Sequence, residues 1–271
     1  MIQVTGNVFV ENEFVACNLG LITTEEGVVL IDVPIRPTDA VKWRDETSKR
    51  GELRYVINTE EHADHCQNSC FFSGVLVTSQ ITRGKMVNMT SDEITDRTMR
   101  LDPEGLSLMK SFKLRLADIT ISENMNIYLG GLTFNLFPLP GHSTGGIGVY
   151  LPEQKILFAT DCIFHHVKTW MPEADPDRWL ESLKKLEKLD IDVIVPGHGS
   201  ICNKDYIKEQ TGIIRQWMEV IQTAIKQGFS IEEAIDRISP PDPYPKQPNT
   251  PLTEDELNRK IITRLYNHYL K

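Results

Sequence analysis

Four short stretches of the chain carry side chains of the types that bind transition metals. The first reads Glu60-x-His62-x-Asp64-His65, and the other three supply His142, Asp161 and His198. Imidazole and carboxylate groups together suit zinc, iron or manganese. The sequence therefore predicts that the chain binds one or two such ions and uses them for hydrolysis.

The spacing within the first stretch suits a site for two ions. In an extended segment, side chains two residues apart point the same way, so Glu60, His62 and Asp64 share one side. His65 faces a different direction and can reach a second ion. Two ions held a few ångströms apart need ligands splayed in this manner.

A short apolar segment precedes each stretch and predicts the strand that positions it. These segments are residues 55–59, 132–139, 156–160 and 193–196. Loops at strand ends converge on one edge of a sheet, where α/β proteins build their sites. Glycines beside His142 and His198 allow tight backbone turns close to a metal.

The remaining segments predict a mixed α/β chain with a helical end. Residues 27–32 are apolar without alternation, as in a strand buried on both faces. The polar stretch 80–117 has helical spacing broken at Pro103 and predicts two helices, a candidate lid over the site. We expect one domain over residues 1–204 and a helical extension over 205–271. The extension has helices at 205–227, 230–238 and 253–270, and its proline-rich part, residues 240–251, forms an ordered loop or a linker.

Taken together, these motifs resemble those of the metallo-β-lactamase superfamily. That family's first motif is usually His-x-His-x-Asp-His after a strand ending in Asn-Thr, and this chain has Asn58-Thr59-Glu60-Glu61-His62-Ala63-Asp64-His65. The later motifs match in order and separation, as Gly141-His142-Ser143, Thr160-Asp161 and Pro196-Gly197-His198-Gly199. The resemblance covers roughly residues 1–200 and implies an αββα sandwich with a dinuclear site.

The resemblance also implies a role for each side chain. Glu60, His62 and His142 would hold the first ion. Asp64, His65 and His198 would hold the second, and Asp161 would bridge the two. A water or hydroxide between the ions would be the nucleophile, and Asp64 would also orient it as the catalytic residue. Two zinc ions are the expected cofactor, with iron or manganese as alternatives.

Glu60 departs from the family pattern, which has histidine at this position. Two divalent ions bring a charge of about +4, and three carboxylates with one hydroxide bring about −4. The net charge is then about zero, where the usual ligands leave about +1. The bound water should be less acidified, and harder metals such as manganese or iron should be favoured slightly. Alternatively, Glu60 hydrogen-bonds a ligand histidine and does not bind the ion itself.

Other residues near the motifs are candidates for contact with substrate. His165 and His166 follow Asp161 on the chain, and Trp170 comes shortly after. We expect these three to contact substrate, with solvent-exposed loop positions as the alternative for the two histidines. Asp32 ends a buried strand and is expected to be a structural carboxylate close to the cluster.

The composition restricts the surroundings and partners of the chain. Its formal charge of −9 disfavours binding to a nucleic-acid backbone. No apolar run approaches ~18 residues, and the N-terminus lacks the pattern of a secretory signal, so we expect a cytoplasmic protein without a membrane segment. Five cysteines without framework spacing agree with reduced thiols. A small-molecule substrate is expected, and a homodimer remains open.

The leading hypothesis is a metallo-hydrolase that attacks the carbonyl of an ester, thioester, lactone or lactam with a metal-bound hydroxide. Weak β-lactamase turnover would be compatible with it. Three alternatives stay open: a phosphodiesterase or ribonuclease of the same fold, a mono-iron oxygenase of the persulfide dioxygenase type, and a non-catalytic protein that kept its metals.

Overall fold

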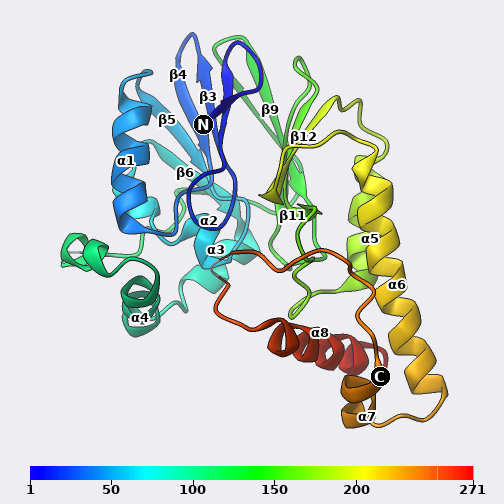
Figure 1. Cartoon of the computed structure of the whole chain (residues 1–271). Helices are drawn as coiled ribbons and strands as arrows, with labels where there is room; N and C mark the ends of the chain where they lie inside the picture. Colours follow the sequence, from blue (N-terminus) through cyan, green and yellow to red (C-terminus); the bar gives the residue numbers. More distant parts are fainter. Residues whose placement is uncertain (111, 249, 271) are drawn as a thin grey trace.

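Two β-sheets packed face to face form the centre of the molecule, with helices outside both (Figure 1). The computed structural model describes residues 1–110, 112–248 and 250–270. The first sheet has the order β1-β2-β3-β4-β5-β6-β7, and the second β12-β11-β10-β9-β8. The strands of the first sheet are β1 (Ile2–Gln3), β2 (Val8–Glu11), β3 (Leu19–Thr24), β4 (Gly27–Ile31), β5 (Leu53–Ile57), β6 (Val75–Ser79) and β7 (Ile119–Ile121). Those of the second are β8 (Met125–Leu129), β9 (Leu132–Pro138), β10 (Ile147–Leu151), β11 (Ile156–His165) and β12 (Val193–Gly199).

Strand direction brings the ends of several strands to one edge. In the first sheet β4 to β7 run parallel to one another. In the second, β11 and β12 are parallel, while β9, β10 and β11 alternate in direction, so β9 runs the same way as β11. The segments that follow β4, β5 and β9 therefore emerge on one side. The metal-binding motifs lie there, as the sequence predicts.

Three apolar cores hold the layers together. The core between the sheets includes Val29, Phe134 and Phe158. Helix α1 (Pro37–Ser48) covers the outer face of the first sheet with Trp43, which is fully buried. Helices α5 (Pro176–Leu186) and α6 (Tyr206–Lys226) cover the second sheet. This αββα arrangement confirms the predicted fold class.

The segment between β6 and β7 is largely helical, but residues 112–117 are not, and a break before α4 divides the part that precedes Pro103, where the sequence predicted two helices with one break at Pro103. It contains α3 (Gln80–Met86), α4 (Ser91–Leu101) and the 3-10 helix η2 (Pro103–Met109). Helix α4 begins at a capping box in which Thr90 and Glu93 satisfy each other's backbone amides. It ends at Leu101, shortly before Pro103, because a proline inside a helix has no backbone N–H to donate to the preceding turn. In Figure 1 this insert projects from the sandwich beside the site edge. The short helices α2 (Ala63–Cys66) and η1 (Ser69–Phe71) follow β5.

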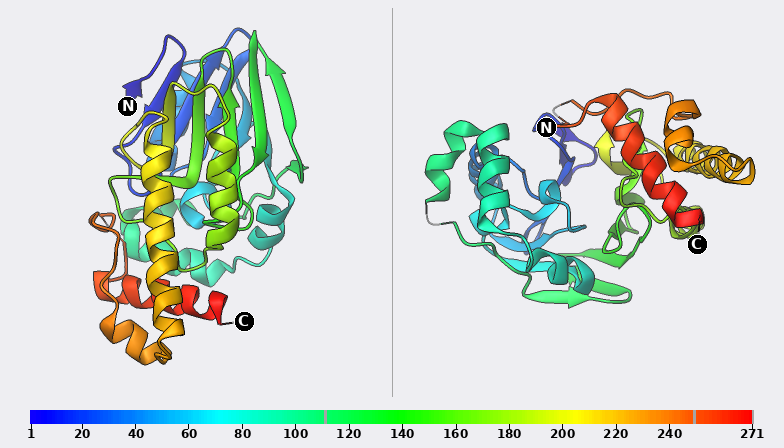
Figure 2. Two further views of the ribbon diagram at one scale, coloured as in Figure 1. Left: turned by 90° about the vertical axis from the view of Figure 1, so that its right-hand side faces the viewer. Right: turned by 90° about the horizontal axis from the view of Figure 1, so that it is seen from below.

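Of the three C-terminal helices, α6 packs on the outside of the second sheet, α8 (Glu254–Tyr269) packs against α6, and α7 (Ile231–Arg237) packs against α8. All three lie within two residues of the predicted bounds at each end. Figure 2 shows α8 crossing below the sandwich and alongside α6 and α7. The leucine and isoleucine side chains of α8 join the core that contains Trp179 and Trp217. A division of the chain after residue 204 stays a prediction.

The proline-rich segment before α8 is fixed to the sandwich. Asp242 is buried and accepts a hydrogen bond of 2.8 Å from the backbone amide of Thr169. The amide of Lys168 donates to the Pro245 carbonyl at the same distance. Of the two forms that the sequence allows, the ordered loop is therefore observed. Among the described residues, no helix is both long enough and apolar enough to cross a membrane.

Candidate metal centre

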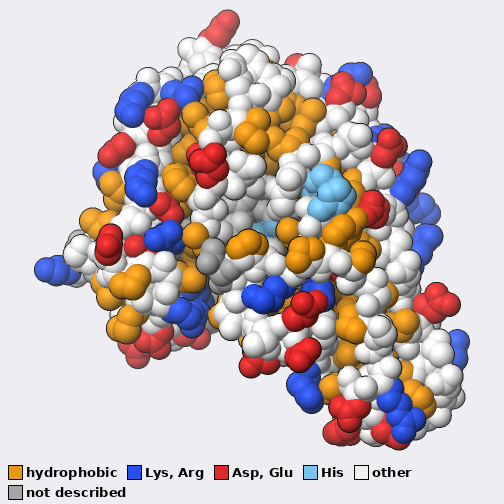
Figure 3. All heavy atoms as spheres, viewed as in Figure 1, with side chains coloured by type: hydrophobic (Ala, Val, Ile, Leu, Met, Phe, Trp, Pro, Cys, Tyr) orange, Lys and Arg blue, Asp and Glu red, His pale blue; other side chains and the backbone are white. Residues whose placement is uncertain are grey.

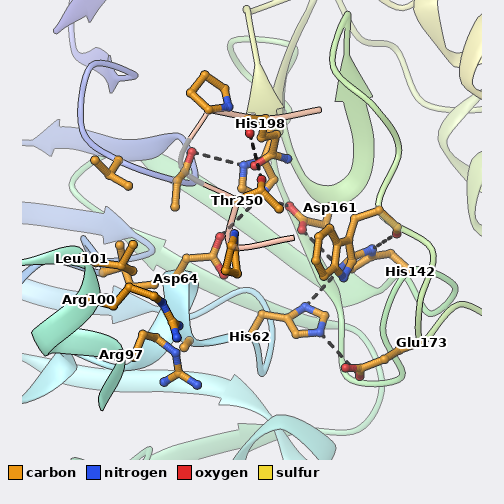
Figure 4. A pocket seen from close by; sticks show the side chains of 18 residues that line it. His62, Asp64, Arg97, Arg100, Leu101, His142, Asp161, Glu173, His198 and Thr250 are labelled. Carbon is orange, nitrogen blue, oxygen red and sulfur yellow. Dashed lines mark hydrogen bonds and ion pairs between the residues drawn. The ribbon is translucent and has the colours of Figure 1, made fainter. Parts of the chain in front are cut away.

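Seven side chains from segments of both sheets converge at the site edge. We call them the ligand cluster: Glu60, His62, Asp64, His65, His142, Asp161 and His198. Figure 4 shows His62, Asp64, His142, Asp161 and His198 of this set. Glu60 and His62 lie in the loop after β5, and Asp64 and His65 lie in α2. His142 follows β9, as predicted. Every metal-binding candidate of the sequence is thus brought to one place.

Asp161 and His198 lie inside strands, whereas the sequence analysis placed them just after strands. β11 runs on to His165 and β12 to Gly199. The pairing between them shifts register on both sides of Thr160, whose φ is +48°. This irregularity interrupts the ladder next to Asp161. The short apolar run 156–160 covers only the regular first part of β11, so the continuation of the strand to His165 was not predicted.

Four residues of the cluster form one group of donor atoms. Glu60 Oε1 lies 2.6 Å from His62 Nδ1 and 3.5 Å from His142 Nε2. His142 Nε2 lies 3.2 Å from Asp161 Oδ2 and 3.1 Å from His62 Nδ1. Two imidazole nitrogens and two carboxylate oxygens therefore lie within 4.8 Å of one another, close enough to bind one metal ion together.

The second group shares Asp161 with the first. His198 Nε2 lies 3.4 Å from Asp64 Oδ2 and 3.3 Å from Asp161 Oδ1. His65 Nε2 lies 3.4 Å from the same oxygen of Asp161. Oδ2 of this carboxylate thus faces the first group and Oδ1 the second. A carboxylate that bridges two ions needs this arrangement.

Unpartnered polar atoms inside the cluster fit bound metal. His65 Nε2 and Asp161 Oδ1 are buried and have no hydrogen-bond partner within the described part of the chain. Such atoms are costly unless something satisfies them, and a cation between them would do so. The donor types are those that bind zinc, iron or manganese in proteins. The residues present therefore fit a metal centre.

Outer hydrogen bonds orient three of the histidines. His65 Nδ1 lies 2.9 Å from Asp32 Oδ2. His142 Nδ1 donates to the Trp170 carbonyl at 2.8 Å, and His198 Nδ1 to the Ala16 carbonyl at 3.1 Å. Each contact leaves the ring's Nε2 directed at the cluster, as is usual for metal-binding histidines. The prediction that Asp32 is a structural carboxylate beside the cluster is confirmed.

His62 has the opposite orientation. Its Nδ1 faces the cluster, and its Nε2 lies 3.6 Å from Glu173 Oε2. Glu173 is 58% exposed, so this ion pair is screened by solvent. His62 therefore has the weakest outer support of the four histidines.

Glu60 is 1% exposed and both of its oxygens are engaged. Oε1 faces His62 and His142, and Oε2 accepts a hydrogen bond of 2.8 Å from Ser143 Oγ. Burial alone would raise the pKa of Glu60, but the neighbouring histidines outweigh it and hold the pKa below its ordinary value. The carboxylate is thus ionised and aimed at the first group. Both hypotheses for it, ligand and hydrogen-bond partner of His62, agree with this placement.

Two glycines are required by the packing around the cluster. Gly141 has φ +153°, and a Cβ there would lie 2.4 Å from Trp179. A Cβ on Gly197 would lie 1.8 Å from Asp161 Oδ1. The sequence analysis expected these glycines to allow tight turns close to a metal. The positive φ of Gly141 agrees with a tight turn, whereas Gly197 is required by close packing against Asp161.

A cavity of about 270 Å³ opens over the cluster. Trp170 lines it, as predicted for a residue in contact with substrate. His165 and His166 do not belong to the residues that line this cavity. The His165 ring stacks on His166 at 4.0 Å and lines a separate hollow with Tyr206. Their expected substrate contact therefore has no support in the geometry, because β11 extends through His165 and turns these rings away.

Other residues that line the cavity were missed by the sequence analysis. They are Arg97 and Arg100 of α4, Glu173, and residues 247, 248, 250 and 251 of the proline-rich segment. The spacing of the two arginines was a usable signal, since residues three apart share a helix face. Nothing local in the sequence connects the proline-rich segment to a site built from residues between 60 and 198.

Comparison with known proteins gives one family. A family model described as the metallo-beta-lactamase superfamily matches residues 12–198. A Beta-lactamase-like protein 2 homolog of Caenorhabditis elegans is 23% identical over 185 residues, covering 65% of this chain and 54% of that protein. A hydroxyacylglutathione hydrolase of Bartonella henselae is 29% identical over 96 residues, covering 35% and 36%. The chain thus spans about half of the first relative and about a third of the second.

Solved structures agree on the fold. A metallo-beta-lactamase family protein from Thermus thermophilus superposes with a TM-score of 0.73 at 16% identity, covering 99% of this chain and 94% of the other. The superposition includes the C-terminal helices, because nearly the whole chain is covered. At this identity the likeness concerns the fold alone.

Proposed function

The chain belongs to the metallo-β-lactamase superfamily, and we propose that it is a metal-dependent hydrolase of a small carbonyl substrate, an ester, thioester, lactone or lactam. Two zinc ions are the proposed cofactor. The observation that carries the proposal is the placement of Asp161. Its Oδ2 lies 3.2 Å from His142 Nε2 and its Oδ1 lies 3.3 Å from His198 Nε2, so one carboxylate serves both groups of donors.

Each group of the ligand cluster would hold one ion. Glu60, His62 and His142 would hold the first, and Asp64, His65 and His198 the second, with Asp161 between them. When bound, divalent ions polarise a carbonyl oxygen and lower the pKa of bound water. Asp64 is the proposed catalytic residue, because its Oδ2 faces His198 while its side chain also lines the cavity.

The cavity above the cluster supports a small substrate. Its volume of about 270 Å³ is near the lower limit of ligand pockets. Trp170, Ile35 and Leu101 provide apolar walls. One relative is named for the hydrolysis of a hydroxyacylglutathione, which supports acyl transfer to water as the reaction class.

Turnover of metal-loaded protein tests the proposal. The chain would be loaded with zinc, manganese or iron and assayed against one ester, thioester, lactone and lactam each. We expect hydrolysis of at least one class, abolished by a chelator and reduced by Asp161→Asn. A surface variant such as Asp45→Asn, far from the cluster, provides the control. Absence of turnover on every class with two ions bound would overturn the proposal. Oxygen uptake with a persulfide, or cleavage of single-stranded RNA, would replace it with one of the alternatives.

A further inference from the structure

Two arginines of the helical insert line the cavity above the ligand cluster. Arg97 and Arg100 lie three residues apart on α4, so they occupy one face of the helix, and Leu101 lines the cavity beside them. Figure 4 shows both side chains on the side of Asp64, away from His142 and Glu173. In the space-filling view, basic side chains of the insert border the hollow in the middle of this face (Figure 3). The cavity is thus basic at one end.

Neither guanidinium forms an ion pair with a carboxylate in the described part of the chain, although Asp64 and Glu93 act electrostatically on Arg97 from a greater distance. No carboxylate lies within 4.0 Å of Arg97 or Arg100 among residues 1–110, 112–248 and 250–270. Arg97 Nη1 instead donates to Gln67 Oε1 at 2.5 Å, and Gln67 is fully buried. This contact fixes one nitrogen of the Arg97 guanidinium and leaves its remaining N–H donors for another acceptor.

The charge distribution makes this pair unusual. The chain has a formal charge of −9, and acidic side chains outnumber basic ones 38 to 29. The ligand cluster, with Glu60 in place of histidine, would leave two bound divalent ions close to neutral. The ions would therefore attract an anion only weakly. Glu173, at the other end of the cavity, is already paired with His62 and would repel an anion placed there.

We propose that Arg97 and Arg100 bind a carboxylate on the acyl part of the substrate, and so select acid-substituted esters or thioesters. This inference rests on the proposed function, because it assumes that the reacting carbonyl sits at the ligand cluster. A guanidinium offers two parallel N–H donors to a carboxylate, a geometry with both strength and direction. A neutral substrate would leave both arginines without this partner.

The first measurement is binding, which is independent of turnover. Glutarate would be titrated into metal-loaded full-length chain by calorimetry, and again after chelation of the metal. We expect Arg97→Gln with Arg100→Gln to weaken glutarate binding roughly ten- to hundredfold in both states. Lysine at both positions should restore part of it. Equal affinity of the native chain and the double glutamine variant would overturn the proposal.

Two matched controls separate the pair from general effects. Arg44→Gln removes a positive charge from α1, where Arg44 is 46% exposed and pairs only with Asp45. Met99→Gln alters α4 itself at a side chain that is 55% exposed. Both should bind glutarate as the native chain does. If Arg44→Gln lost as much affinity for glutarate as the double variant, the effect would be explained by net charge alone. That result would also overturn the proposal.

The second measurement is selectivity between two esters of one leaving group. The probes are 4-nitrophenyl acetate, which is neutral, and mono-4-nitrophenyl glutarate, which carries a carboxylate. We expect the double glutamine variant to raise KM for the glutarate ester roughly tenfold or more while kcat for the acetate stays within about threefold. An equal loss on both esters contradicts a carboxylate subsite. If neither ester is hydrolysed, the proposed function fails on these substrates, and the glutarate titration still decides whether the arginines bind the anion.

Discussion

Ser143 donates its hydroxyl hydrogen to Glu60 Oε2 across 2.8 Å, although the two residues are 83 positions apart in the chain. Both residues are buried: the exposed fraction is 1% for Glu60 and 3% for Ser143. The contact turns the other oxygen of Glu60 toward His62 and His142. A carboxylate with one oxygen held in this way has a single direction open to a metal.

Loss of this contact should weaken the first metal site. We expect Ser143→Ala to lower affinity for the more weakly held ion about 10- to 100-fold, the usual effect of removing a hydrogen bond to a ligand. Glu60→Gln should lower it further, because the negative charge is lost as well, whereas Glu60→His should retain both ions. Competition with a chromophoric chelator measures the affinities. Two ions bound at native affinity in Glu60→Gln would show that Glu60 only hydrogen-bonds His62.

A second prediction concerns the two carboxylates that contact ligand histidines from outside. Asp32 Oδ2 lies 2.9 Å from His65 Nδ1 and is 4% exposed, while Glu173 is 3.6 Å from His62 and 58% exposed. We expect Asp32→Asn to lower metal affinity about 10- to 100-fold and Glu173→Gln to change it much less. Elemental analysis after dialysis against a metal buffer measures the metal content of both variants. A larger effect of Glu173→Gln would contradict the order argued from burial.

Metal binding should release protons at neutral pH. In the metal-free protein, burial alone would lower the pKa of His198, but Asp161 and Asp64 outweigh it and raise the pKa to about 10. The protonated ring stabilises the metal-free fold fully below the ordinary pKa of 6.5, and this contribution is lost as pH rises through about 10. An ion must displace that proton, so metal affinity should increase with pH between these limits.

Calorimetry in buffers of different ionisation enthalpy measures this proton release. At pH 7 we expect at least one proton released for the two ions bound by the native chain, and fewer for His198→Ala. A binding enthalpy that is independent of the buffer would be the contrary result.

Alanine substitutions at two separate glycines, Gly197 and Gly212, test how tightly the cluster is packed. Ala at 197 would place a Cβ 1.8 Å from Asp161 Oδ1, so we expect Gly197→Ala to reduce metal content and to destabilise the fold by about 2 kcal/mol or more. Gly212 lies within α6 with nothing inside 4 Å of an added Cβ. Gly212→Ala should stabilise the fold by up to about 1 kcal/mol through helix propensity. Urea unfolding of the metal-free native chain and of both variants measures these free energies. Equal stability of Gly197→Ala and the native chain would contradict the packing argument.

Local patterns determined much of this protein before any contact was known. The apolar runs of the strands, the histidines and carboxylates that follow them, and the adjacent glycines are properties of short segments. The αββα sandwich was implied by the resemblance to the metallo-β-lactamase superfamily, whereas the local patterns predicted a mixed α/β chain, the convergence of all seven cluster residues and the C-terminal helices. Each depends on periodicity or on strand direction, and both can be read over a few residues.

The tertiary structure alone decided which distant side chains meet. The hydrogen bond from Ser143 to Glu60, the two faces of Asp161, and the place of Arg97 and Arg100 over the cluster depend on how the two sheets and the insert pack. The same packing turned His165 and His166 away, because β11 continues past its most apolar part. Contacts between residues far apart in the chain follow from the whole core, and no short segment of the sequence carries that information.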